Sequence, residues 1–204
     1  MSQDPSTAPT TGDDEPSDES LMAQYALGDI AAFERLYTRH EMRLWRYLLR
    51  HVGEPALADD LAQDVWFAVT REAQRYEPRA SAKFSTWLFT LAHHRMVDSY
   101  RARRRGHVSL DADSSEGEES LLESLQADDE SGPLAQIESR EQAQALLAAI
   151  EQLPTVQREA FLLQAEGGMQ VNDIAQATGV SFETAKSRLR YARDKLRQCL
   201  QEYA

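Results

Sequence analysis

The chain has 204 residues, 42% of them hydrophobic and 8% aromatic, with one cysteine, Cys199, and a formal net charge of −12. A single cysteine excludes an intramolecular disulfide and a zinc knuckle, which fits a reducing compartment. The longest uninterrupted apolar stretch, residues 145–150, is far shorter than the ~20 residues of a membrane-spanning helix, and the scarcity of Gly, Pro and evenly spaced β-branched residues favours an all-α fold.

The negative charge is concentrated in two segments. Residues 1–20 and 106–139 together hold 16 of the 34 acidic residues and no Lys or Arg. The rest of the chain therefore contains 18 acidic residues and all 22 basic residues. This division is typical of a nucleic-acid-binding protein with acidic connectors.

Residues 1–20 predict a disordered acidic tail, because they consist almost wholly of Asp, Glu, Ser, Thr, Pro and Gly. Without an early Lys or Arg and an apolar core, this segment is not expected to be a signal peptide. We therefore expect a soluble, cytoplasmic protein.

Three amphipathic helices are predicted over residues 21–105, where short connections indicate one small bundle. The first spans 29–52 and ends at Gly53; the second begins at Pro55 and ends at Pro78. The third runs from Ser85 to Arg103. The apolar positions of the first two helices are Phe33, Leu36, Tyr37, Leu44, Leu48, Val52, Leu57, Leu61, Val65, Ala68 and Val69.

The second helix contains an acidic stretch, DDLAQDVWF (59–67). Asp60 and Asp64 are one turn apart, with Gln63 and Phe67 on the same side. Such a face predicts a docking surface for a basic partner, and a merely solvated acidic face is the alternative.

The third helix, FSTWLFTLAHHRMVDSYRARRR (84–105), begins with aromatic residues and ends with four arginines. Arginines this close repel one another unless an anion is near, and DNA supplies one phosphate charge per ~1.7 Å of axis. Exposed aromatic side chains beside such a patch stack on unpaired bases; packing in the core is the alternative. His93 and His94 point about 100° apart on a helix, so we expect no metal site, but partly buried packing for His93 and a DNA contact for His94.

Residues 106–133 predict a flexible acidic linker, and residues 134–204 a second domain of four helices. Val171–Arg197 has the pattern of a helix-turn-helix, with Gly179 at the turn and Ser181 as the N-cap of the last helix. That helix buries Ala185, Leu189, Ala192, Leu196 and Cys199/Leu200, and its opposite side carries Lys186, Arg190, Arg193 and Arg197. We expect its first residues to reach base edges and its arginines to contact phosphates; an ordinary amphipathic helix is the alternative.

Four segments in this order resemble the sigma-70 family of RNA polymerase sigma factors, of the extracytoplasmic-function type. AFERLYTRHEMRLWRYL and LADDLAQDVWFAV resemble the beginning and the polymerase-binding part of region 2. FSTWLFTLAHHRMVDSYRARRR resembles the segment that melts and reads the −10 element. LPTVQREAFLLQAEGGMQVNDIA, followed by KSRLRYARDKLR, resembles region 4, which reads the −35 element and contacts the polymerase flap.

The resemblance implies three sets of site residues and no catalytic residue, metal or cofactor. Contact with the clamp helices of the largest polymerase subunit falls on Asp59, Asp60, Gln63, Asp64, Trp66 and Phe67. Contact with the −10 element falls on Arg79, Lys83, Phe84, Trp87, His94, Arg95, Arg101, Arg103, Arg104 and Arg105. Contact with the −35 element falls on Ser181, Phe182, Glu183, Thr184, Lys186, Ser187, Arg188, Arg190, Arg193 and Arg197.

The chain departs from the family pattern at three positions. Glu183 begins a stretch where the family often has Gly-Thr-Val-Lys-Ser-Arg, His94 replaces a frequent Asn, and Trp66 replaces a usual Phe. Glu183 brings a negative charge to the recognition helix, where it would accept a hydrogen bond from a cytosine or orient the helix.

Other functions remain open at this stage. A helix-turn-helix repressor would bind operator DNA without polymerase, and a metal-dependent nuclease would use Asp59, Asp60, Asp64, His93 and His94; a scaffold protein would not need the basic helix. The resemblance also implies an anti-sigma factor. A further hypothesis is that the acidic tail and linker cover the basic faces of the free protein.

Overall fold

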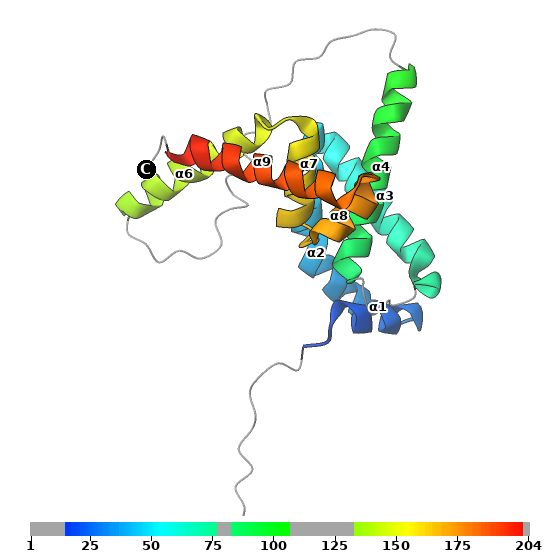
Figure 1. Ribbon diagram of the computed structural model, residues 1–204. Coiled ribbons are helices and arrows are strands. Elements are labelled where there is room, and N and C mark those ends of the chain that lie inside the picture. The colour runs from blue at the N-terminus through cyan, green and yellow to red at the C-terminus, as the bar shows by residue number, and fades with distance from the viewer. Residues whose placement is uncertain (1–14, 77–82, 107–132, 202–204) are drawn as a thin grey trace, which may run out of the picture.

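The computed structural model describes residues 15–76, 83–106 and 133–201, and the regular structure within these ranges is entirely helical. This confirms the predicted all-α class. Within the described ranges, no helix is both long enough and apolar enough to cross a membrane. In chain order the elements are α1 (Asp18–Ala26), α2 (Ile30–Val52), α3 (Pro55–Glu72), the 3-10 helix η1 (Ala73–Arg75), α4 (Phe84–Gly106), α6 (Pro133–Glu151), α7 (Thr155–Ala165), α8 (Val171–Thr178) and α9 (Phe182–Gln201) (Figure 1).

Helix α1 corrects the expectation of a disordered tail up to residue 20. Ser17 caps the helix, since its Oγ accepts a hydrogen bond from the Ser20 amide at 3.2 Å. Two acidic residues in the first turn favour the helix dipole, and Leu21 and Met22 are completely buried. Over residues 15–76 and 83–106, the first bundle therefore contains four α-helices and not three; residues 1–14 lie outside the described residues.

Helices α2, α3 and α4 form the rest of this bundle, with α1 across one end (Figure 1). Asp29 caps α2 by accepting a hydrogen bond from the Ala31 amide at 3.0 Å. The long helix α4 buries Phe84, Leu88, Phe89, Ala92 and Met96. Helix α3 ends at Glu72, earlier than the expected end at Pro78, and Pro78 lies outside the described residues.

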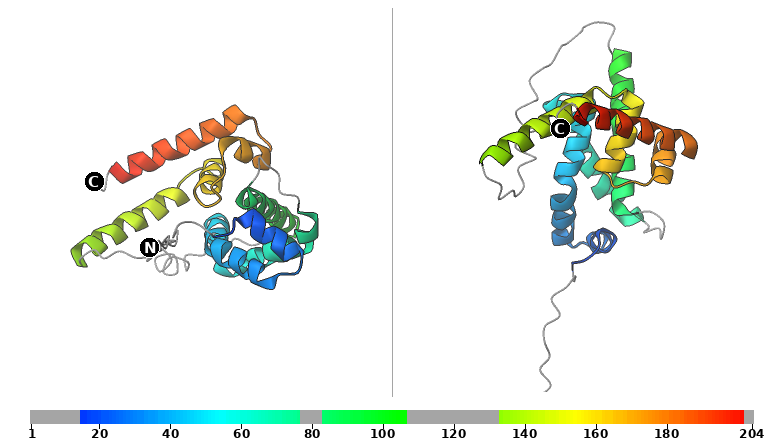
Figure 2. Two further views of the ribbon diagram at one scale, coloured as in Figure 1. Left: turned by 90° about the horizontal axis from the view of Figure 1, so that it is seen from below. Right: turned by 60° about the vertical axis from the view of Figure 1, so that its left-hand side comes forward.

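The second bundle has the four predicted helices. Helices α6 and α9 run side by side in opposite directions and extend away from the remaining helices (Figure 2). The predicted helix-turn-helix is α8 and α9, with Gly179 between them at φ 67°, a left-handed backbone conformation that glycine adopts without strain. The expected linker, residues 107–132, lies outside the described residues.

The two bundles pack against each other, because α7 and α8 lie on α2 and α4 (Figure 1). Their buried residues form one connected hydrophobic cluster, from Leu21 in α1 to Leu196 in α9. The two domains that we expected to be joined only by a flexible linker are therefore in direct contact in this structure.

Candidate functional site

An aromatic groove of about 820 Å³ opens between α2 and α3. Exposed apolar side chains line it, with Phe67 57% and Met42 46% exposed, and a contiguous exposed apolar patch is typical of an interaction site. We use the name aromatic groove for its lining residues Phe33, Tyr37, Glu41, Met42, Trp45, Asp59, Ala62, Gln63, Trp66, Phe67 and Thr70.

Ring contacts fix the shape of the aromatic groove. Trp66 is buried and packs edge-on against Phe33, with ring centroids 5.8 Å apart, and lies 5.0 Å from the Tyr37 ring. Across the groove, Trp45 Nε1 donates a 2.7 Å hydrogen bond to Asp59 Oδ1, which joins α2 to α3. The two walls are therefore held together in the free chain, and the surface needs little reorganisation to receive a partner.

The predicted docking residues fall partly inside this groove. Asp59, Gln63, Trp66 and Phe67 line it, whereas Asp60 and Asp64 are exposed outside the lining. The α2 wall was missed from the sequence, where Phe33 and Tyr37 were assigned to the core stripe. Tyr37 is 40% exposed. The signal that could have found the wall is a second stripe at i, i+4 spacing, formed by Phe33, Tyr37, Glu41 and Trp45.

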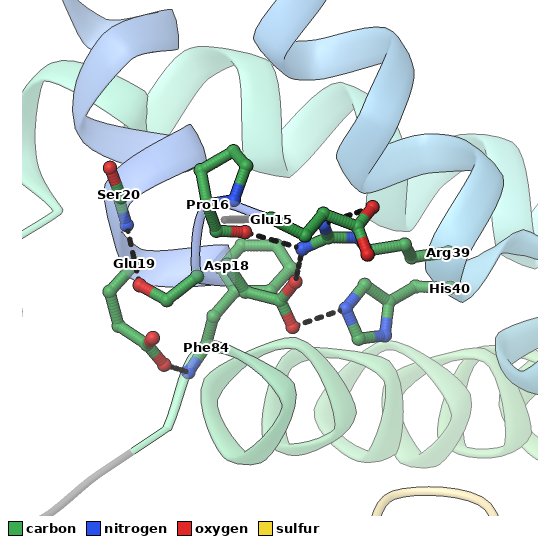
Figure 3. A network of polar contacts seen from close by, with 9 residues as sticks. Glu15, Pro16, Asp18, Glu19, Ser20, Arg39, His40 and Phe84 are labelled. Carbon is green, nitrogen blue, oxygen red and sulfur yellow. Dashed lines mark hydrogen bonds and ion pairs between the residues drawn. The ribbon is translucent and has the colours of Figure 1, made fainter. Parts of the chain in front are cut away.

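The N-terminus of α4 is held by a polar network from α1 (Figure 3). Glu19 Oε1 accepts a 2.8 Å hydrogen bond from the Phe84 amide, and the Asp18 carboxylate lies 2.9 Å from Arg39 Nη1 and 2.7 Å from His40 Nε2. Burial raises the pKa of Asp18, but the hydrogen bonds from His40 and Arg39 outweigh it, so the net pKa is lowered.

Phe84 itself does not lie where a base-stacking residue is expected. It is completely buried, with its ring 5.4 Å from His40 and 5.8 Å from Trp87. In this structure the ring packs against His40 of α2 and Trp87 of α4 instead of facing solvent, so it supports the site from within the core. Trp87 is partly buried against Tyr76, at 5.1 Å.

The polar residues of α4 are more accessible. His94 and Lys83 are exposed, and Arg95 is partly buried. Arg79 lies outside the described residues, and the side chains of Arg104 and Arg105 are likewise not described. Exposed acids accompany the basic end: Arg101 Nη1 is 3.7 Å from Asp98 Oδ1, and Arg103 Nη2 is 3.6 Å from Glu54 Oε2. Such solvated pairs contribute little and exchange readily for phosphate.

His93, for which we expected partly buried packing, is buried and faces α7, where its Nδ1 lies 3.0 Å from Glu159 Oε1. Among the residues that the structure describes, no three His, Cys, Asp or Glu side chains gather closely enough to hold a metal ion.

The last helix has the two predicted faces. Ala185, Leu189, Ala192 and Leu196 are buried, and Cys199 is partly buried. Ser181 Oγ accepts a 3.2 Å hydrogen bond from the Thr184 amide, which confirms the N-cap.

Most of the predicted DNA-contacting side chains of α9 are accessible. The guanidinium of Arg190 lies 4.9 Å from the ring centre of Tyr191, and Arg193 donates a hydrogen bond to Gln164 of α7. Ser187 and Arg188 are partly buried; the exposed members of the set are Ser181, Phe182, Glu183, Thr184, Lys186, Arg190, Arg193 and Arg197.

A buried charge cluster joins the two bundles. Glu166, at the end of α7, accepts hydrogen bonds from Arg46 Nη2 at 3.1 Å and from Arg50 Nη1 at 2.6 Å. The side chains of Glu166 and Arg50 are 8% and 9% exposed. Burial lowers the pKa of Arg50, and the charge of Glu166 opposes this shift. No sequence pattern predicted this contact, because Glu166 and Arg50 are 116 positions apart.

Comparison with known families divides the chain at the same place as the fold. The family model described as Sigma-70 region 2 matches residues 36–106, which lie in the first bundle. The family model described as Sigma-70, region 4 matches residues 143–196, which lie in the second.

Curated relatives match over most of their length. RNA polymerase sigma factor CarQ of Myxococcus xanthus is 34% identical, over 89% of this chain and 96% of the relative. RNA polymerase sigma factor CnrH of Cupriavidus metallidurans is 32% identical, over 89% and 93%. ECF RNA polymerase sigma factor SigK of Mycolicibacterium vanbaalenii is 30% identical, over 89% and 88%.

Solved structures share the fold at lower identity. CnrH in complex with the cytosolic domain of CnrY aligns with a TM-score of 0.59 at 24% identity, covering 93% of this chain and all of that one. RpoE in complex with the anti-sigma factor NepR from Bartonella quintana aligns with a TM-score of 0.57 at 22% identity, covering 83% and 96%. The helical arrangement is therefore one that known proteins adopt.

Proposed function

The chain belongs to the sigma-70 family of RNA polymerase sigma factors, in its extracytoplasmic-function group, and we propose that it binds core RNA polymerase, recognises −35 and −10 promoter elements and promotes melting of the promoter. Membership in this family supports a role in transcription initiation. The protein would catalyse no bond chemistry and would act in the cytoplasm, where its polymerase and promoters are found.

The observation that carries the proposal is the preformed aromatic groove. Its rim combines Asp59 with exposed Phe67 and Met42, and a surface with apolar anchors beside a carboxylate suits a helical partner with basic and apolar side chains. We assign this groove to the clamp helices of the largest polymerase subunit. The resemblance to region 2 supports the same assignment for Gln63 and Trp66.

Promoter contacts follow from the exposed basic surfaces of both bundles. In this proposal α4 reads the −10 element through His94 and Arg95, while Arg101 and Arg103 hold the adjacent duplex. In α9, residues Phe182–Lys186 approach base edges and Arg190 contacts phosphate. Contacts at two promoter elements by one chain give avidity, because the second contact becomes intramolecular.

We divide the chain functionally into an acidic N-terminal tail, region 2 up to residue 105, a linker over 106–133 and region 4 from residue 134. A partner that occludes these surfaces is also part of the proposal. A solved relative is described in complex with the anti-sigma factor NepR, and the groove and basic faces of this chain offer an anti-sigma factor comparable surfaces.

The proposal is tested by run-off transcription with purified core polymerase and genomic DNA fragments, with and without the full-length chain. We expect discrete transcripts that require the chain and that disappear with an Arg190→Ala, Arg193→Ala double variant. Transcripts that do not depend on the chain, or repression of transcription by it, would contradict the proposal. Repression would instead favour a helix-turn-helix repressor.

A further inference from the structure

Helix α7 presents two carboxylates to the first bundle. Glu159 and Glu166 are seven residues apart, which places them on one side of the helix, close to two turns apart. Glu166 accepts hydrogen bonds from Arg46 and Arg50 of α2, and Glu159 lies 3.0 Å from His93 of α4. One face of α7 therefore brings negative charge to two arginines of α2 and to the imidazole of His93 in α4.

The contact at Glu166 is buried and closely fitted. Arg46 is 20% exposed, and both oxygens of the Glu166 carboxylate are used, at 3.1 Å from Arg46 and 2.6 Å from Arg50. The next residue, Gly167, lies against Phe89 so closely that an added Cβ would be 3.0 Å from the ring and 2.6 Å from the Leu163 carbonyl oxygen. The end of α7 is thus positioned by packing as well as by charge.

Two guanidinium groups around one carboxylate have the chemistry of a phosphate site. Arginine presents several N–H donors in a plane and binds carboxylate and phosphate oxygens with the same geometry. Along α2, arginines recur at spacings of four, three and four, the spacing that the basic side chains of α9 also have. The residues of this row are Arg39, Arg43, Arg46 and Arg50.

The row leads towards the basic end of α4. Tyr100 of α4 donates a 2.5 Å hydrogen bond to the carbonyl oxygen of His51, the residue after Arg50. Arg103, one turn further along α4, lies 3.6 Å from Glu54 just beyond the end of α2. The carboxyl ends of α2 and α4 are therefore neighbours.

We propose that Arg46 and Arg50 form a binding site for the phosphate backbone of promoter DNA, and that Glu166 occupies this site in the free protein, with Glu159 as a second anionic contact. This inference rests on the proposed function, because it extends the DNA surface of α4 onto α2. When region 4 moves to its own promoter element, α7 leaves and the two guanidinium groups become available for phosphate.

The aromatic groove stays open while α7 is in place. It is lined from α2 by Tyr37, Glu41 and Trp45, and none of its lining residues belongs to α7 or α8. Core polymerase can therefore bind region 2 before the bundles separate. The contact of Glu166 with Arg46 and Arg50 would in this way prevent DNA binding by α2 until the chain has bound the polymerase.

The test compares full-length variants for binding to a short DNA duplex of arbitrary sequence, by fluorescence anisotropy over a series of salt concentrations. In the Glu159→Gln/Glu166→Gln variant, Arg46 and Arg50 have no carboxylate partner as long as the bundles stay together. Because unpaired buried charges are costly, the variant favours separation of the bundles. We expect DNA affinity at low salt to rise on the order of tenfold, and the slope of log K against log salt to steepen by about two units, roughly 0.9 for each added phosphate contact.

A second variant assigns the gain to the arginines. Arg46→Gln and Arg50→Gln are added to the Glu159→Gln/Glu166→Gln variant. This removes the two positive charges, so no unpaired charge is buried, and the salt slope should return to that of the wild type. Glu34→Gln/Glu72→Gln is the control matched in charge, since it removes two exposed carboxylates from the first bundle, which carries Arg46 and Arg50, and it should leave the slope nearly unchanged. Circular dichroism establishes that each variant is folded.

Two results would overturn the inference: an unchanged slope in Glu159→Gln/Glu166→Gln, or a steeper slope that persists after the arginines are replaced. The second result would mean that separation exposes DNA-binding residues elsewhere, such as those of α9. Binding of each variant to core polymerase is measured separately. A chain that gains DNA affinity through Arg46 and Arg50 but never binds polymerase would refute the proposed function and would leave only the phosphate site covered by Glu166.

Discussion

Trp45 and Asp59 join the two walls of the aromatic groove, through a 2.7 Å hydrogen bond from the indole Nε1 to the carboxylate Oδ1. Trp45→Phe keeps an aromatic ring but removes the donor. We expect a loss of about 1 kcal/mol in binding to core polymerase, because a hydrogen bond to a charged acceptor orders this surface before contact. Titration of labelled protein with core polymerase measures it. An Asp59→Asn variant should cause a similar loss that does not add to the first, since both changes remove the same bond; fully additive losses would show that the bond has no role.

Phe67 is the most exposed aromatic side chain described in the groove, at 57%. Phe67→Ala should weaken binding to core polymerase by on the order of 2 kcal/mol, as a central aromatic anchor does, and should leave the stability of the free chain within about 0.5 kcal/mol. Ile30→Ala, at a residue 68% exposed and outside the groove, is the control and should bind as the wild type. Equal effects of the two changes would argue against the groove as the docking surface.

Because α1 carries a polar network, the effect of an N-terminal truncation on stability should depend on whether the truncation removes residues of α1. Deletion of residues 1–14 leaves Ser17, Asp18 and Glu19 in place and should not change the free energy of unfolding. Deletion of residues 1–20 removes the helix cap, the partner of Arg39 and His40, and the acceptor of the Phe84 amide. We expect that deletion to cost about 2 kcal/mol or more, measured by urea unfolding.

The same truncations separate stability from inhibition by the acidic tail. If the tail covers DNA-binding surfaces, deletion of residues 1–14 alone should raise the affinity of the free chain for DNA at low salt. Glu19→Ala is the matched point change for the network and should lower stability by about 1 kcal/mol with DNA affinity unchanged. A stable chain after deletion of residues 1–20 would mean that the network of α1 contributes nothing to folding.

His51 predicts a dependence of stability on pH. Burial lowers its pKa to about 4, despite a 2.7 Å hydrogen bond from its Nδ1 to the Tyr47 carbonyl oxygen. Above pH 6.5 this residue is neutral in both the folded and the unfolded states and contributes no slope. As the pH falls from about 6.5 to about 4, the unfolded chain takes up a proton that the folded chain does not, so stability should fall by up to about 3 kcal/mol.

Urea unfolding of the wild type and of His51→Gln at a series of pH values measures this slope. The variant should lack it, and equal slopes would contradict the assignment to His51. Asp18 provides a control in a different range. Its folded pKa is lowered, so its contribution is present above its ordinary value and is lost only as the pH falls through the lower folded pKa. Asp18→Asn should therefore lower stability at neutral pH, and it should change the pH dependence only at the acid end of the curve.

Local patterns predicted much of this fold. The stripe that includes Leu36, Leu44 and Leu48, and the turn at Gly179, follow from spacing and backbone preference, which depend on neighbours in the sequence. Helix α1 was missed because its first turn is acidic and its stability depends on Arg39 and His40, more than 20 residues away.

The candidate site was predicted less completely, because it depends on which face of a helix is covered. The family resemblance implied a DNA contact for Phe84, and spacing assigned Tyr37 to the core, whereas packing buries Phe84 and leaves Tyr37 40% exposed. The contact of Glu166 with Arg46 and Arg50 depends on how two bundles meet, and no periodicity within either bundle encodes it.

The most direct test of the proposed function is to mix the full-length chain with core RNA polymerase at moderate salt and to detect the complex by native gel electrophoresis. Our prediction is a stable one-to-one complex that Phe67→Ala weakens and Ile30→Ala does not. A wild-type chain that migrates apart from polymerase under these conditions, although folded, would contradict it.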